Sequence, residues 1–215
     1  MKRAFSAARG GTGPVLALAA LLLLGGCAIL SAGEGPPVRL FTPHPKTSFD
    51  PDLPKVEWQL AIDPPIAPAS LDTVRIAVQK SPLELDYYAN AAWADRVPSM
   101  VQTLLISSFE NTGKIVGVGR MSSTLRADFT LRTEIRDFEV QGEAAQPSAR
   151  VRIVSKLIRM PEREIVADDT CDYNQPAPGG TLDAIVEAYN DVLGRCMRRI
   201  VEWTMRTGNR VKRVR

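Results

Sequence analysis

Residues 129–140 read FTLRTEIRDFEV, and the alternation of apolar and polar side chains in this stretch is typical of a strand with one buried face. The parity of the apolar positions changes once, between Ile135 and Phe138. A shift of one residue moves all later side chains to the other face, and a β-bulge corrects it. We therefore expect a bulge or sharp bend near Arg136-Asp137.

Two more strands follow this stretch. Residues 151–157 alternate in the same way after a loop at 141–148. Residues 160–163, MPER, are typical of a turn with proline at its second position. Residues 164–172 then return as the partner strand, so that the three strands form an antiparallel meander.

Two amphipathic helices flank the meander. The first is predicted over residues 97–109, with Pro98 in its first turn and the sequence Asn-Thr-Gly at 111–113 as its end. The second follows Thr181, a suitable N-cap, and is predicted to run for about 25 residues and to end at Gly208. Trp203 continues this helix and is interpreted as a core or near-core residue.

Shorter strands complete the pattern at residues 56–62, 73–78 and 114–119, whereas residues 83–95 are interpreted as irregular. The resulting order, β-β-α-β-β-β-β-α, predicts a single domain at residues 56–206. Because each helix has one apolar stripe, the elements must bury against one another. We expect an α/β (α+β) sandwich: a mixed, mostly antiparallel sheet with both long amphipathic helices on one face.

The N-terminus is typical of a signal peptide over residues 1–26. Its basic head is followed by an apolar run of ten residues at 15–24. This run is too short for a membrane-spanning helix, which needs roughly 20 apolar residues. Residues 24–27, LGGC, resemble the bacterial lipobox, which implies that Cys27 carries a diacylglyceryl group and a further acyl chain such as palmitate. The alternative is an ordinary cleaved signal with a chance cysteine.

Residue 28 and the segment after it indicate which membrane holds the protein and how far from that membrane the domain can lie. Ala28 is not the aspartate that favours retention in the inner membrane in this class, so the resemblance implies the periplasmic face of the outer membrane. Six prolines in residues 28–55 predict an extended tether that starts at the lipidated Cys27. In a polyproline conformation it would reach on the order of 85 Å.

Charge excludes one class of function. The 27 basic residues include three in the signal peptide, and removing them leaves 24 of each sign. The net charge of zero gives no electrostatic case for nucleic-acid binding. Basic residues nevertheless crowd the C-terminal tail at 207–215 and the residue before it. The tail is interpreted either as a solvated end or as a contact for anionic lipid headgroups.

The two remaining cysteines, Cys171 and Cys196, either form a disulfide or stay separate buried thiols. An oxidising compartment favours the bridge, whereas the position of Cys196 on an apolar helix stripe is also explained by burial alone.

No catalytic or metal-binding arrangement is recognisable in the sequence. The only histidine, His44, lies in the proline-rich segment, and no cysteine and histidine cluster has zinc-ligand spacing. The acidic pair Asp168-Asp169 lies on a strand, where neighbouring side chains point to opposite faces. We therefore predict a protein that is not an enzyme and that uses no metal or cofactor.

Aromatic residues supply the other candidate site. Tyr87, Tyr88 and Trp93 lie in the segment interpreted as irregular, just before the first helix. They either contact a partner, as aromatic anchors tend to do, or pack a loop onto the domain.

Residues 85–98, LDYYANAAWADRVP, together with the helix to Phe109, resemble the ABC-type transport auxiliary lipoprotein family and its PqiC group. In that family a tyrosine-containing segment leads to a tryptophan, then to Asp-Arg-x-Pro and an amphipathic helix. Residues 127–131 and 136–138 and the long terminal helix also match. The resemblance covers most of residues 56–206.

This resemblance implies a docking or bridging role beside an Mce/Mla-type ABC transporter that moves lipids between the two membranes. The partners implied are a periplasmic Mce-domain protein with its ABC permease and ATPase, and a homo-oligomeric ring of this chain. A second hypothesis, reached without the resemblance, is an envelope-assembly lipoprotein that helps to place an outer-membrane protein or a secretin.

Overall fold

The computed structural model describes residues 36–122, 126–142 and 146–213. The predicted signal peptide, Cys27 and the first part of the predicted tether lie outside the described residues. From Val38 onward the described chain belongs to one compact unit. None of its described helices combines the length and the apolar character needed to cross a membrane.

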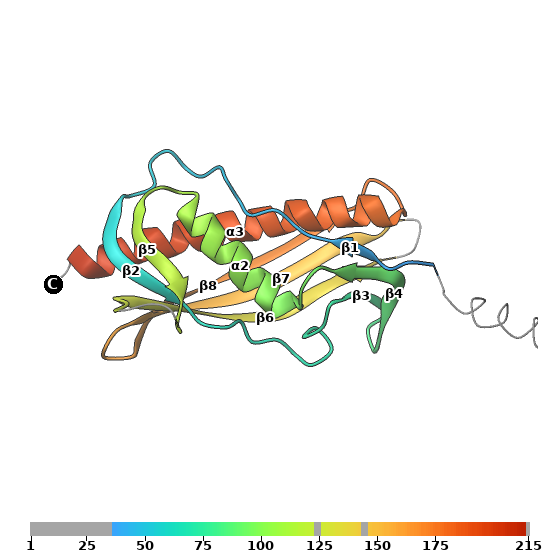
Figure 1. Cartoon of the computed structure of the whole chain (residues 1–215), viewed down its shortest axis with the longest axis horizontal. Coiled ribbons are helices and arrows are strands. Elements are labelled where there is room, and N and C mark those ends of the chain that lie inside the picture. Colours follow the sequence, from blue (N-terminus) through green and yellow to red (C-terminus); the bar gives the residue numbers. More distant parts are fainter. Residues whose placement is uncertain (1–35, 123–125, 143–145, 214–215) are drawn as a thin grey trace, which may run out of the picture. The chain divides into compact units, whose positions relative to one another are not determined.

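Within the described residues, the chain forms one sheet of eight strands and two helices. The strands are β1 (Arg39–Phe41), β2 (Val56–Ile62), β3 (Arg75–Ser81), β4 (Glu84–Trp93), β5 (Ile115–Arg120), β6 (Phe129–Gln141), β7 (Ser148–Arg159) and β8 (Glu164–Pro176). The helices are α2 (Val97–Glu110) and α3 (Leu182–Arg213). Both helices lie on the same side of the sheet, as predicted (Figure 1).

The long strand β6 organises the sheet. Strand β7 pairs with it antiparallel over nearly its whole length, and β8 pairs antiparallel with β7. The other side of β6 is shared, because β2 pairs in parallel with its beginning and β3 in parallel with its end. The register of β6 and β7 shifts between Ile135 and Asp137, which confirms the predicted bulge. The mixed sheet and the meander are therefore as predicted.

Aromatic side chains fill the core at both ends of the sheet. Trp93 meets Phe138 and Tyr189 edge-on, with ring centroids 5.8 and 5.0 Å apart. Trp58 meets Phe129 in the same way at 5.1 Å. All of these rings are buried, so the apolar faces of the strands and the helices close on one another.

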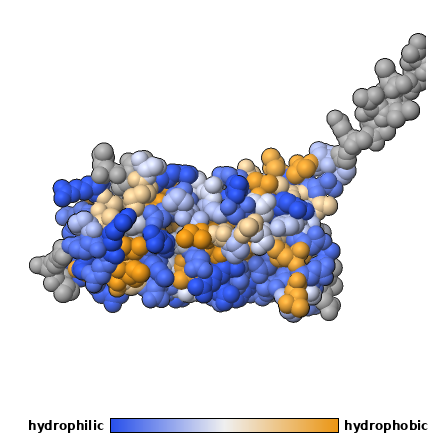
Figure 2. Space-filling model, turned by 90° about the horizontal axis from the view of Figure 1, so that it is seen from below, coloured by the Kyte–Doolittle hydropathy of each residue, from blue (hydrophilic) through white to orange (hydrophobic). Residues whose placement is uncertain are grey.

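The opposite face of the sheet is largely hydrophilic, and Figure 2 shows it from the side away from the helices. Ion pairs between neighbouring strands cover part of it. Arg150 of β7 pairs with Asp172 of β8 at 2.5 Å, and Arg152 pairs with Asp137 of β6 at 2.8 Å. Such half-exposed pairs contribute little to stability, and their charged groups make this face of the sheet hydrophilic.

Residues 83–95, predicted to be irregular, in fact contain strand β4. The prediction was wrong because the alternation is broken within the strand. Asn90 has a positive φ of 54°, and the register between β3 and β4 shifts twice. Each break changes the face on which later side chains fall, so no single period of two runs through the segment.

The prediction of a free tether up to residue 55 was wrong from Val38 onward. Strand β1 pairs in parallel with β4, and Leu53 is buried. Side chains of the helices satisfy the extended backbone: the N–H of His44 donates to Asn190 Oδ1 at 2.9 Å, and that of Lys46 to Ser108 Oγ at 3.0 Å. A proline-rich composition predicts extended chain, but it does not say whether that chain is packed.

The predicted end of the second helix at Gly208 was also wrong, because α3 continues to Arg213. A Cβ atom at Gly208 would lie 2.6 Å from Cζ2 of Trp58. Glycine is needed here for the close approach of α3 to β2, and not as a helix stop. Residues 207–213 are accordingly helical rather than a frayed tail.

Candidate functional site: an arginine-lined groove beside the C-terminal helix

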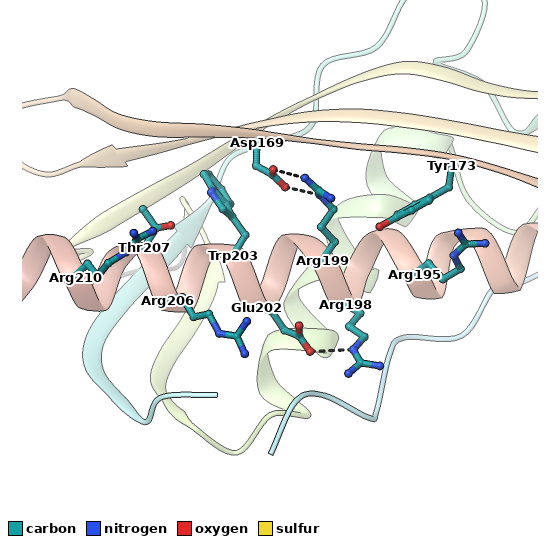
Figure 3. A pocket seen from close by; sticks show the side chains of 10 residues that line it. All are labelled: Asp169, Tyr173, Arg195, Arg198, Arg199, Glu202, Trp203, Arg206, Thr207 and Arg210. Atoms are coloured by element: carbon teal, nitrogen blue, oxygen red, sulfur yellow. Dashed lines mark hydrogen bonds and ion pairs between the residues drawn. The ribbon is translucent and has the colours of Figure 1, made fainter. Parts of the chain in front are cut away.

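A groove of about 540 Å³ runs between α3 and β8. Figure 3 shows its lining, which carries five arginines and two carboxylates: Asp169, Tyr173, Arg195, Arg198, Arg199, Glu202, Trp203, Arg206, Thr207 and Arg210. The arginines come to one side because most of them recur at intervals of three, four or seven residues, which a helix places on one face. The buried stripe of α3 fixes the orientation of this face.

One ion pair joins the two walls of the groove. Arg199 of α3 donates from Nε and from a terminal nitrogen to the two carboxylate oxygens of Asp169 on β8, at 2.8 and 2.7 Å. Asp169 thereby raises the pKa of Arg199 above its usual value. This two-point geometry fixes the guanidinium plane. The side chain of Arg199 is therefore held against β8 by the ion pair.

The other arginines differ in how strongly they are held. Arg198 pairs with Glu202 one helical turn later at 2.9 Å, and Arg206 pairs with Asp50. Arg195 lies over the ring of Tyr173, 4.4 Å from its centroid. The side chain of Arg210 forms no hydrogen bond or ion pair with any described residue. The groove therefore keeps guanidinium groups that no carboxylate of the described residues neutralises.

The groove continues into a second hollow of about 520 Å³, which shares Thr207 and Arg210 with it and is also lined by the ion pair of Arg159 and Glu164. Its walls include Val166, Ala167 and Val211, and Ile165 at its rim is exposed. A guanidinium fork matches carboxylate and phosphate oxygens in geometry. The groove thus suits an anionic ligand or segment that also carries apolar groups.

A disulfide between Cys171 of β8 and Cys196 of α3 lies beneath the groove, with the two Cα atoms 5.4 Å apart. Both cysteines are fully buried. Cys171 lies between Asp169 and Tyr173 in sequence, and Cys196 follows Arg195. The bond therefore ties together the two elements that carry the lining residues.

The three aromatic residues considered either as partner contacts or as packing for a loop do not form one surface. Trp93 is 1% exposed and belongs to the core, so its assignment as a contact was wrong. Tyr87 donates its hydroxyl to the carbonyl of Ser70 at 2.9 Å, and Arg75 lies over its ring. Tyr88 is half-buried, and burial raises its pKa. A partner contact at Tyr87 and Tyr88 stays a prediction.

The arginine groove was not among the sequence predictions, although part of its signal is visible. The arginines of residues 195–210 repeat on the polar side of the predicted helix, and this pattern could have indicated a basic face. Their partners could not be found in this way, because Asp169, Tyr173 and Asp50 come from other parts of the chain. Within the described residues, no group of His, Cys, Asp and Glu has the arrangement of a metal site.

Comparison with known proteins agrees with the fold. A crystal structure of a protein from Xanthomonas campestris has a TM-score of 0.78 and 29% identity, and the match covers 82% of this chain and 99% of that one. A crystal structure of an uncharacterized protein has a TM-score of 0.60 at 12% identity, covering 77% of this chain and 97% of the other, which shows a shared fold alone.

Sequence comparison adds a relative and a family. An uncharacterized protein of Bradyrhizobium diazoefficiens is 29% identical over 180 residues, which are 80% of this chain and 47% of that protein. The chain thus spans about half of that relative's length. The model of the family described as ABC-type transport auxiliary lipoprotein component matches residues 39–201. This match covers most of the chain, and the protein therefore belongs to the family of ABC-type transport auxiliary lipoprotein components.

Proposed function

We propose that the protein is held by lipid on Cys27 to the periplasmic face of the outer membrane, and that it docks the periplasmic Mce-domain subunit of an ABC lipid transporter. The arginine groove carries the docking part of this proposal. Arginine and aromatic residues are enriched where proteins bind one another, and this groove combines five arginines with Tyr173 and Trp203.

The position of the groove supports a role in bridging. Arg39 of β1 pairs with Asp183 at the beginning of α3, at 2.5 Å. Lys212 near the end of α3 pairs with Asp128, which precedes β6, also at 2.5 Å. The chain thus enters the domain beside the first turn of α3, whereas most of the groove lies along its second half. The anchor and the docking surface would then be at different ends of the domain.

The chemistry of the groove selects the kind of partner surface. Arg195 and Arg210 have no carboxylate partner among the described residues, and one wall of the neighbouring hollow is apolar. A partner segment with acidic residues beside one or two apolar side chains would satisfy both parts. We therefore expect the Mce-domain subunit to present such a segment.

The test is a crosslinked pull-down from intact envelopes, with proteins identified by mass spectrometry. The native chain should recover an Mce-domain protein with its permease and ATPase. The double variant R195E/R210E should lose most of this recovery, whereas K55E, with a charge reversal at an exposed lysine outside the groove, should keep it. Recovery of only a barrel or a secretin would overturn the transporter role and favour envelope assembly.

The lipid anchor is tested separately. Mass spectrometry of the mature N-terminus should show an acylated Cys27 and no residues 1–26. The C27A variant should leave the membrane fraction. An unmodified cysteine at this position would overturn the anchor without bearing on the docking groove.

A further inference from the structure

The outer edge of β8, on the side away from β7, has no partner strand among the described residues. β8 pairs with β7 alone, and no described backbone group outside that pairing forms a hydrogen bond with β8. In an antiparallel pair, every second residue turns its N–H and C=O away from the partner strand. A row of backbone donors and acceptors therefore lies open beside the groove between α3 and β8 (Figure 3).

This edge is longer and more regular than the other free edges of the described sheet. Proteins commonly keep edge strands short, bulged or interrupted by proline, which prevents other chains from pairing with them. β1 has three residues and β5 has six, whereas β8 has 13. The register of β8 with β7 is unbroken from Ala167 to Gln175, because its one shift lies before Ala167 and Pro176 ends the strand. An edge of this kind is suited to the addition of a further strand.

The side chains of β8 determine which faces of an added strand could be acidic. Asp169 and Tyr173 face α3, where they contact Arg199 and Arg195. An added strand would continue the alternation of β8, so that every second one of its side chains would face the arginines. The others would lie next to the opposite face of β8, where Asp168 is exposed. Carboxylates are therefore favoured on the α3 side of an added strand and disfavoured beside Asp168.

The two arginines without a carboxylate partner set the spacing of these acidic residues. Arg195 and Arg210 both line the groove and are 15 positions apart in α3, which corresponds to about 22 Å along the helix axis. A strand covers this length in about six to seven residues. Side chains share a face of a strand only at even separations. Two carboxylates six positions apart would thus reach both guanidinium groups.

We propose that the groove binds an extended segment of the docked protein as an additional strand on the outer edge of β8, with two carboxylates six positions apart that pair with Arg195 and Arg210. This inference rests on the docking groove of the proposed function and adds the way in which the partner segment binds. Main-chain hydrogen bonds to β8 supply affinity, and the alternate side chains over α3 supply specificity. The disulfide between Cys171 and Cys196 ties together the two elements that the segment contacts.

The experiment uses the full-length lipidated protein in detergent micelles and two synthetic nine-residue peptides of identical composition. Both contain two glutamates among threonines and valines. The glutamates are at positions 2 and 8 in the first peptide and at positions 2 and 7 in the second, which would turn them to opposite faces of a strand. Because the net charges are equal, attraction between charges alone predicts equal binding. Fluorescence anisotropy measures affinity, and hydrogen exchange measures the protection of β8 amides.

The first peptide should bind about fivefold more tightly than the second, which is the expected range for one exposed ion pair. It should also slow amide exchange within residues 167–175. Equal affinities, or unchanged exchange in β8, would overturn the strand addition. The variant R195E/R210E should prefer the analogue of the first peptide with lysines at positions 2 and 8 to that with lysines at positions 2 and 7. A variant with native circular dichroism that shows no such preference would also overturn it.

Further outcomes separate this inference from the proposed function. Protection of β8 by the first peptide, together with an envelope pull-down that recovers no Mce-domain protein, would overturn the proposed function and support the strand addition. Recovery of the Mce-domain protein without protection of β8 by either peptide would do the reverse. Binding of short-chain phosphatidylglycerol that R195E/R210E abolishes, again without protection of β8 by either peptide, would mean that the groove takes a lipid headgroup, which overturns the strand addition.

Discussion

The two ends of α3 are built alike inside and differ outside. At its beginning, Tyr189 packs with Trp93 of β4, and near its end, Gly208 packs against Trp58 of β2. Each end therefore has a buried tryptophan that closes the core. The surfaces differ, because the apolar Val38 and Leu40 are exposed at β1 whereas arginines line the second half of the helix. The buried contacts form one compact unit. The difference that bears on function is in the exposed side chains at the two ends of α3.

The largest expected effect tests whether Trp93 closes the core at the β1 end. Replacing Trp93 with alanine removes the centre of an aromatic cluster and should cost about 3–5 kcal/mol of the free energy of unfolding. Tyr87→Ala in the same strand removes a half-exposed ring and should cost roughly 1 kcal/mol. Urea denaturation measures both values. Equal costs would mean that Trp93 is not a core residue, and the β1 end would then lack the buried tryptophan that Trp58 supplies at the other end.

The next effect concerns the bond that joins the halves of the groove. The disulfide closes a loop of 25 residues, and removing it in C171A/C196A should lower the free energy of unfolding by about 3 kcal/mol. Reductant should lower the melting temperature of the native chain and leave that of the variant unchanged. Complete alkylation of both cysteines after unfolding without reductant would show instead that they are free thiols.

A smaller effect tests the close approach at the other end. Gly208→Ala should destabilise the fold by about 1–3 kcal/mol, because the new methyl group overlaps the Trp58 ring and the core must shift. The matched control is Gly194→Ala in the same helix, where the nearest atom is Lys46 Cδ at 3.9 Å. It should stabilise by about 0.5–1 kcal/mol through helix propensity alone. Stabilisation by both changes would contradict the packing of Gly208 on Trp58.

The same contrast between inside and outside explains what could be predicted from sequence. The alternation of residues 129–140 predicted the bulge and the meander correctly. It could do so because a strand with one buried face has apolar residues at every second position. Strand β4 was missed because Asn90 breaks its period, and residues 38–55 because distant side chains such as Asn190 hold their backbone. The groove depends on pairs such as Arg199 with Asp169, which no local pattern contains.

The smallest effect depends on pH and lies at the β1 end, where Glu139 of β6 is 7% exposed. Its carboxylate accepts hydrogen bonds from the N–H of Phe138 at 2.7 Å and from Gln141 Nε2 at 2.9 Å. Burial nevertheless raises its pKa above the ordinary value of 4.5, and the negative charge of Asp137 raises it further. A raised pKa in the folded state means that the folded chain holds this proton more tightly than the unfolded chain does.

The stabilisation that follows is fully present below the unfolded value and is lost as the pH rises through the folded value. Glu139→Gln has no such proton to lose, so the native chain should lose stability relative to this variant as the pH rises above the ordinary value of 4.5. Unfolding by urea at several pH values measures the difference, and a constant offset from the changed hydrogen bonds does not affect its slope. Glu57→Gln, at an exposed position of β2, is the matched control for the loss of a carboxylate. A difference for Glu139→Gln that is flat, or that slopes the other way, would mean that the carboxylate remains charged without cost. The β1 end would then be more hydrated inside than its burial indicates.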